Sequence, residues 1–201
     1  MKKMTNGLIL MLAMLWMPLL WAQSAPEKLI QDTTQDVLDT IKARHQEFLD
    51  EPARLYAMVD EKVLPHFDFE RMTNLALGRY KRKVKGEKKQ QLVQAFRDLL
   101  VRTYGKALLE YNDQEVEYLP MRGKLSKGEV TVRTEIQQQG GFPIPINYDL
   151  YEKDGRWLVY DLNIDNISLV TNYRTTFARE IKSKGVDSLI KILQSRNQEA
   201  K

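Results

Sequence analysis

Apolar residues recur every three or four positions in several stretches of the chain after residue 25, a spacing that predicts amphipathic helices. Pro52 suits the first turn of the second helix, and Asp68 can cap the third. Gly105 falls inside the fourth, where it allows a bend or the close approach of a neighbour. The expected helices span residues 26–50, 52–65, 68–78 and 86–111.

From residue 115 the pattern changes to the alternation that is typical of strands. Short turns rich in glycine separate these segments and predict an antiparallel meander. Pro143 and Pro145 limit the first half of the third strand to an edge or an entry segment. The expected strands span residues 115–119, 129–137, 144–152 and 156–164.

The last strand and the helix after it are the centre of the predicted fold. Alternation places Trp157, Val159 and Asp161 on one face and Leu158, Tyr160, Leu162 and Ile164 on the other. Both faces are largely apolar, so the strand should be covered on both sides. Ser168 should cap the next helix, which ends at Gly185, and Asp187 should cap a final one.

The order of elements indicates an α+β fold with one highly curved, mainly antiparallel sheet of about four strands, wrapped by helices from both ends of the chain. The space between the sheet and the helices must be filled by side chains or hold a ligand. Composition alone does not decide between a solid core and a cavity.

The first 22 residues have the pattern of a secretory signal peptide, with two lysines, an apolar run and small residues before the expected cleavage after Ala22. The apolar run is too short for a membrane span. Residues 23–201 should then form a single exported domain. Loss of Lys2 and Lys3 lowers the formal net charge from +4 to +2, too small an excess to indicate nucleic-acid binding.

Candidate catalytic groups are few. The chain has no cysteine and two histidines, His45 and His66, without the spacing of metal ligands. Asp161 stands between apolar neighbours, and a buried carboxylate with a raised pKa can act as a general base. A small enzyme of the nuclear-transport-factor-like class would use it in this way. The alternative is a carboxylate held by backbone N–H groups or by Arg174.

A basic run covers residues 79–89, where seven cationic side chains accompany one acid. Positive charge at the start of a helix opposes the helix dipole and gives no local stability. The run is either a solvated face or a surface for an acidic partner or an anionic membrane.

Five segments have the order and spacing of one protein family. They are 65–72 (PHFDFERM), 77–80 (LGRY), 96–104 (FRDLLVRTY), 157–161 (WLVYD) and 167–177 (ISLVTNYRTTF). Through them the chain resembles the MlaC/toluene-tolerance family of periplasmic phospholipid-binding proteins. Two positions depart from the pattern: Lys81 replaces an aromatic residue, usually Trp, and Asn166 replaces a glycine.

The resemblance implies a nuclear-transport-factor-like fold around an apolar pocket, with bound phospholipid as cargo, no cofactor and no catalysis. It implies a periplasmic carrier between an outer-membrane lipoprotein complex and an inner-membrane ABC transporter with a membrane-anchored substrate-binding component, which maintains outer-membrane lipid asymmetry. A chaperone for lipoproteins is a further alternative.

The matched segments and strand faces supply the expected site residues. The predicted lipid-binding residues are Phe69, Met72, Leu75, Leu100, Tyr104, Leu108, Val132, Ile146, Tyr148, Val159 and Tyr173. Met58 and Met121 are flexible side chains that could also line the pocket. The predicted partner-binding residues are Arg79, Lys81, Arg82 and Lys83.

Overall fold

A computed structural model describes residues 25–110, 114–138 and 140–199 of the chain. The expected signal peptide, residues 1–22, lies outside the described residues. Within the described ranges, no helix is both long and apolar enough to cross a membrane.

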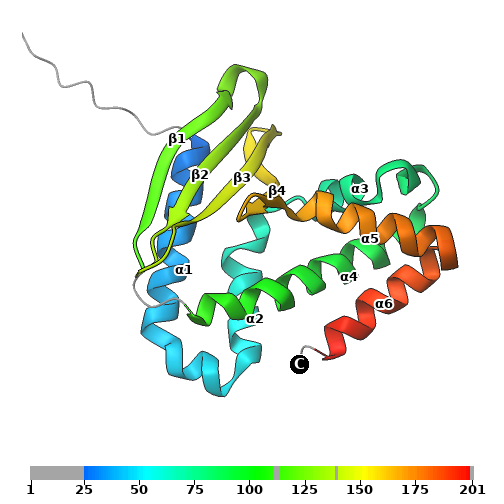
Figure 1. Cartoon of the computed structure of the whole chain (residues 1–201), viewed down its shortest axis with the longest axis horizontal. Helices are drawn as coiled ribbons and strands as arrows, with labels where there is room; N and C mark the ends of the chain where they lie inside the picture. Colours follow the sequence, from blue (N-terminus) through cyan, green and yellow to red (C-terminus); the bar gives the residue numbers. More distant parts are fainter. Residues whose placement is uncertain (1–24, 111–113, 139, 200–201) are drawn as a thin grey trace, which may run out of the picture.

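In the described part of the chain, five antiparallel strands form one sheet in the order β1-β2-β3-β4-β5 (Figure 1). The expected α+β fold with one antiparallel sheet is therefore confirmed, with a very short fifth strand that the sequence did not predict. The strands are β1 Val116–Lys124, β2 Glu129–Ile136, β3 Ile144–Lys153, β4 Arg156–Ile164 and β5 Ile167–Ser168.

Two prolines mark where strands lack a neighbour. The predicted first strand ended before Pro120, but β1 continues to Lys124, because β1 is an edge strand and its pairing is irregular between Leu119 and Arg122. The pairing of β3 with β4 begins at Ile146, so Pro145 pairs in register with β2 only, and its carbonyl accepts a hydrogen bond from Asp165 N–H (2.9 Å) in the turn after β4. The edge or entry position expected for the first half of the third strand holds only for Ile144 and Pro145, because residues from Ile146 onward pair with both β2 and β4.

A β-bulge interrupts β4 at its centre. Leu150 pairs with Val159 and Asp149 pairs with Asp161, so Tyr160 has no residue opposite it. The extra residue reverses the alternation of faces beyond it, and bulges also bend the strand that contains them. The sequence-based assignment of β4 residues to two faces is therefore wrong beyond Val159.

The described ranges form six α-helices, of which α1, α3 and α5 contact the sheet. The helices α1 and α2 form a hairpin whose first arm runs along the sheet, and α5 and α6 extend away from the sheet with α4 beside them (Figure 1). Buried side chains gather in three clusters: among α3, α4, α5 and α6; between α1 and α2; and between the start of α1 and the sheet. The helices are α1 Ala25–Asp50, α2 Pro52–Lys62, α3 Phe69–Leu77, α4 Gly86–Gly105, α5 Leu169–Lys184 and α6 Val186–Glu199. Short 3₁₀ helices follow α2, α3, α4 and β1: η1 Leu64–His66, η2 Gly78–Arg82, η3 Lys106–Glu110 and η4 Leu125–Lys127.

Helix ends follow the predicted capping with one exception. The Asp68 carboxylate accepts a hydrogen bond from Arg71 N–H (2.8 Å) at the start of α3, and Ser168 Oγ accepts one from Thr171 N–H (3.0 Å) at the start of α5. Asp187 is not the cap of α6: it lies in the first turn and forms an ion pair with Lys88 (2.7 Å). Cap residues are recognisable from sequence because the first N–H groups of a helix need a nearby side-chain acceptor. An ion pair between residues 99 positions apart leaves no such local signal.

Gly105 is the last residue of α4, after which the chain tightens into η3 instead of continuing as the predicted long helix. A Cβ at this position would lie 3.4 Å from Tyr56 Cε1. The close approach of a neighbour that this glycine suggested is confirmed.

Candidate functional site

A cavity of about 550 Å³ lies between the inner face of the sheet and the helices α1 to α4. The side chains from the sheet that line it lie on adjacent strands, mostly at paired positions, so they present one continuous and largely apolar face. They are Val116, Thr134, Ile136, Ile144, Ile146, Tyr148, Val159, Leu162 and Ile164. The opposite wall includes Ile30, Val37, Leu38, Val59, Val63, Leu64, Phe67, Phe69, Met72, Leu100, Val101, Tyr104, Leu108 and Leu169.

The β4 bulge decides which residues of this strand reach the cavity. Val159, Leu162 and Ile164 all line it, although strict alternation would separate Val159 from the other two. Asp161 does not belong to the lining residues.

Eight of the eleven predicted lipid-binding residues line the cavity. They are Phe69, Met72, Leu100, Tyr104, Leu108, Ile146, Tyr148 and Val159. Their contact with lipid stays a prediction.

Three of the predicted residues lie outside the lining. Val132 is paired with Tyr148 on the same face, but it is only 1% exposed and packs in the cluster that contains Ile30 of α1. Leu75 packs against the core of α3 to α6.

Tyr173, the third of these, packs edge-on against Phe96, with ring centroids 5.0 Å apart. Met58 and Met121 also lie outside the cavity, in or against the cores of α1–α2 and the sheet. The spacing of apolar residues identifies a buried face but does not tell a core contact from a cavity wall.

The α1 wall was missed for the same reason. Ile30, Val37 and Leu38 have the spacing of an ordinary core stripe, and no sequence signal distinguished them from one. Their role depends on the path of α1 along the sheet (Figure 1).

Burial favours the neutral forms of two titratable groups in the cavity wall, Tyr148 and His66. Thr134 donates a hydrogen bond from Oγ1 to Ile146 O (2.9 Å). Burial raises the pKa of Tyr148 to about 12 and lowers the pKa of His66. Among the described lining residues, the one carboxylate is Glu110, which is exposed at the end of η3. The interior therefore suits uncharged, apolar material.

Asp161 is 8% exposed, and its acceptor positions are taken by the chain itself. Its carboxylate accepts hydrogen bonds from Leu162 N–H (2.8 Å), Val170 N–H (3.1 Å) and the hydroxyl of Ser168. Burial is the largest cause of its raised pKa, which these hydrogen bonds oppose. The expectation that backbone N–H groups hold this carboxylate is confirmed.

Arg174, the other expected partner of Asp161, instead donates a hydrogen bond from Nε to Leu75 O (2.9 Å).

His45 Nε2 lies 3.1 Å from Leu109 O, and this contact links α1 to η3. Across the described ranges, no group of three or more His, Asp or Glu side chains could hold a metal ion.

The basic run forms an exposed surface on η2 and the loop before α4. Lys88 and Lys89 are paired with Asp187 and Glu70, but no carboxylate among the described residues lies within ion-pair distance of the cations at positions 79–83. Val84, 2% exposed, anchors this loop. We call Arg79, Lys81, Arg82 and Lys83 the basic surface.

A family model described as MlaC protein matches residues 31–195. This range includes every residue that lines the cavity except Ile30. The chain belongs to the MlaC family.

Individual MlaC relatives agree over most of the chain. The toluene tolerance protein ttg2D of Pseudomonas putida is 28% identical over 184 residues, 90% of this chain and 84% of that protein. The intermembrane phospholipid transport system binding protein MlaC of Haemophilus influenzae is 24% identical over 181 residues, 88% of this chain and 85% of that protein.

A solved structure has the same fold. It is the phospholipid-binding protein from Ralstonia solanacearum in complex with a phospholipid, which superposes with a TM-score of 0.80 and 32% identity, covering 87% of this chain and 97% of that one. The MlaC-like fold predicted from the sequence is thereby confirmed.

Proposed function

We propose that this chain is a periplasmic phospholipid carrier that holds the acyl chains of its cargo in the cavity between the sheet and the helices. One observation carries the proposal: a space of about 550 Å³ has a continuous apolar wall in place of a filled core. Empty apolar cavities lose packing contacts, so a fold that keeps one this large gains stability when apolar material fills it.

The energetics of lipid transfer explain the form of such a site. Exposing a methylene group to water costs about 0.8 kcal/mol, so a two-tailed phospholipid resists leaving a bilayer by roughly 20 kcal/mol or more. A carrier removes this barrier only if the tails pass directly into an apolar space. It needs no cofactor and no catalytic group.

The relatives support this cargo. The Haemophilus influenzae protein is named for intermembrane phospholipid transport, and the Ralstonia solanacearum structure contains a phospholipid. We extend the proposal to a shuttle between an outer-membrane lipoprotein complex and an inner-membrane ABC transporter, which maintains the lipid asymmetry of the outer membrane.

We also propose that the basic surface docks onto an acidic face of one of these partner complexes. Its four cations are exposed, and they adjoin the start of α4, where the helix dipole is also positive. An acidic protein face would neutralise charge that the chain itself leaves uncompensated.

A vesicle-transfer assay tests the carrier proposal. We expect the protein to accelerate movement of a fluorescent two-tailed phospholipid from donor to acceptor vesicles. Ala107 is an exposed residue of η3 that lines the cavity. Ala107→Trp should abolish most of this acceleration, because the larger side chain would occupy space that the acyl chains need. Lys106→Trp is the matched control, an exposed neighbour that does not line it.

Equal transfer rates with and without the protein would contradict the proposal. An assay in which the protein instead prevents aggregation of an acylated peptide, without moving phospholipid, would favour a lipoprotein chaperone.

A further inference from the structure

Large apolar side chains are exposed at one end of the sheet. Phe142 is 93% exposed in the connection between β2 and β3, and Ile144 at the start of β3 is 37% exposed. Ile167 of β5 is also exposed, and it pairs with Ile164, which pairs in turn with Ile146 near the start of β3. Apolar side chains exposed in a group indicate a contact surface.

This end of the sheet is also where the cavity wall meets the surface. Among the described residues that line the cavity, three are exposed: Ala107 and Glu110 of η3, and Ile144. Ile144 pairs with Ile136, another lining residue, so it belongs to the inner face of the sheet. Phe142 lies two residues before it, at most about 7 Å along the chain. Apolar surface therefore continues from the cavity wall to the outside of the molecule.

The chain on both sides of Phe142 carries no charge. Residues 136–148 form the longest stretch without Asp, Glu, Lys or Arg after residue 27, in a chain of which 29% of residues are charged. Side chains of this kind can leave water without desolvating an ionised group. Asp165, in the turn before Ile167, is exposed and can stay at the level of lipid headgroups.

Glycine and proline restrict the backbone of this connection. Gly140 has a φ of 74°, a conformation that favours glycine. Phe142 and Ile144 each precede a proline, which confines both to extended conformations. The loop therefore loses little conformational freedom when it contacts a partner.

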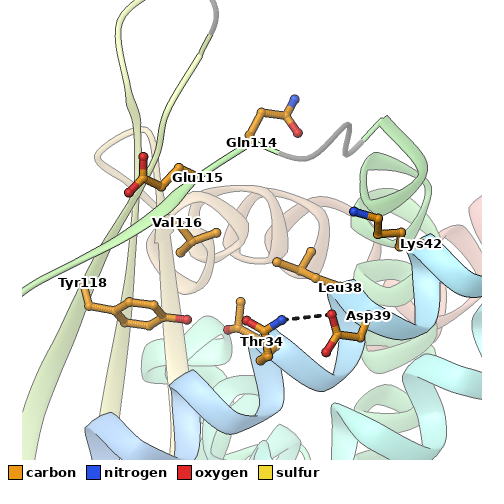
Figure 2. Close-up of a pocket in the computed structure, with 9 residues that line it drawn as sticks. Thr34, Leu38, Asp39, Lys42, Gln114, Glu115, Val116 and Tyr118 are labelled. Carbon is orange, nitrogen blue, oxygen red and sulfur yellow. Dashed lines mark hydrogen bonds between the residues drawn. The ribbon is translucent and has the colours of Figure 1, made fainter.

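A second pocket, of about 320 Å³ between α1 and the start of β1, offers no comparable surface (Figure 2). Asp39, Lys42 and Glu115 are among the side chains that line it. A contact there would bring charged groups against an apolar partner, which costs desolvation free energy.

A bilayer is the partner that fits the exposed loop. A single large aromatic side chain that projects from a loop needs a matching pocket in a protein, whereas a fluid bilayer can surround it without one. Contact at the edge of the cavity would also let acyl chains move between bilayer and cavity along apolar surface, with few methylene groups exposed to water.

We propose that Phe142, Pro143 and Ile144 enter the surface of a phospholipid bilayer and hold the edge of the cavity against it while lipid is taken up or released. The inference rests on the proposed carrier function and adds a membrane-contact surface to it. This surface is distinct from the basic surface, which lies on the helical side of the fold (Figure 1).

The rate of lipid uptake from protein-free vesicles tests the inference. The mature protein is stripped of lipid, mixed with phosphatidylcholine vesicles that contain a fluorescent two-tailed phospholipid, and separated from them after a series of times. These vesicles contain no partner protein and no net charge that would attract the basic surface.

We expect Phe142→Ser to lower the initial rate of uptake about tenfold, because the bilayer contact loses one buried phenylalanine side chain. The final amount of bound lipid should stay the same, since Phe142 does not line the cavity. Phe142→Trp should keep the wild-type rate, because an indole ring also partitions into the bilayer interface.

Leu125→Ser is the matched control. Leu125 is an exposed apolar residue of η4, in the β1–β2 hairpin at the opposite end of β2 from Phe142 (Figure 1). This variant should take up lipid at the wild-type rate.

A wild-type rate in Phe142→Ser, or an equal loss in Leu125→Ser, would overturn the membrane contact and leave the carrier function standing. A lower final amount of lipid in Phe142→Ser would place this side chain in the lipid site and would also overturn the assignment. Folded wild-type protein that takes up no lipid would overturn the carrier function itself.

Discussion

Asp161 is the buried carboxylate that joins β4 to the start of α5. Its hydrogen bonds with Ser168 and with Val170 N–H fix the angle at which α5 leaves the sheet. A group whose acceptor positions are filled in this way is a poor general base, because it must give up these bonds to take a proton from a substrate.

We therefore expect Asp161→Asn to lower stability without changing lipid content. The amide offers one acceptor oxygen where the carboxylate offers two, so the free energy of unfolding should fall by about 1–3 kcal/mol. Urea unfolding measures the first effect and lipid extraction the second. A variant of wild-type stability that has lost activity on a small substrate would instead support an enzyme.

Asp68 adds a pH dependence to stability. Burial would raise the pKa of Asp68, but hydrogen bonds from the Tyr151 hydroxyl and from Arg71 N–H, with the charges of Lys153 and Arg71, lower it overall. A carboxyl whose folded-state pKa is depressed stabilises the fold above its unfolded-state value of about 4, and this stability is lost as pH falls through the folded-state pKa.

Asp68→Asn should therefore be less stable than wild type at pH 7 and should lose less stability on acidification, since asparagine keeps the helix cap but carries no charge. Unfolding in urea over a pH series from neutral to acidic measures this slope. Asp154→Asn is the control, an exposed turn residue with φ of 52° that asparagine also adopts. Parallel pH profiles for wild type and Asp68→Asn would contradict the account.

At the scale of elements, η2 and the loop before α4 form the basic surface on the helical side of the fold (Figure 1). Lys81, one of its four cations, stands at the position where an aromatic residue was expected. Charge, more than an apolar contact, should therefore govern any association through this surface.

The triple variant Lys81→Glu/Arg82→Glu/Lys83→Glu should bind at least tenfold more weakly to inner-membrane vesicles that contain the ABC transporter, because reversing these charges removes the complementarity with an acidic partner face. Its lipid content should be unchanged. Arg122→Glu/Lys124→Glu/Lys127→Glu makes the same charge change on the exposed end of the β1–β2 hairpin. Equal losses in both variants would show that net charge, and not this surface, governs the association.

The sequence predicted helices and turns well because their signals are local. Asp68 and Ser168 each cap a helix through a side-chain oxygen, and Gly78 ends one through its positive φ. The β4 bulge at Tyr160 was not predictable in this way, since it arises from pairing with β3. The cavity wall on α1 was missed because its position depends on tertiary packing.

At the scale of the whole molecule, three clusters of buried side chains in the described ranges, one of which joins α1 to the sheet, leave a space between the sheet and the helices open. The three clusters of buried side chains stabilise the walls. Each cluster contributes side chains to the cavity wall, such as Met72, Val37 and Ile30, and also contains residues that do not line it. We therefore expect the content of the cavity to change without unfolding the protein, as lipid loading and release require.

The central claim is that the cavity holds lipid tails, and direct analysis of bound lipid tests it best. The mature protein would be exported, purified without detergent, extracted with organic solvent and analysed by mass spectrometry. We predict a two-tailed phospholipid in near-equimolar amount with the protein. Folded protein that yields no lipid on extraction, before and after incubation with phospholipid vesicles, would contradict the account.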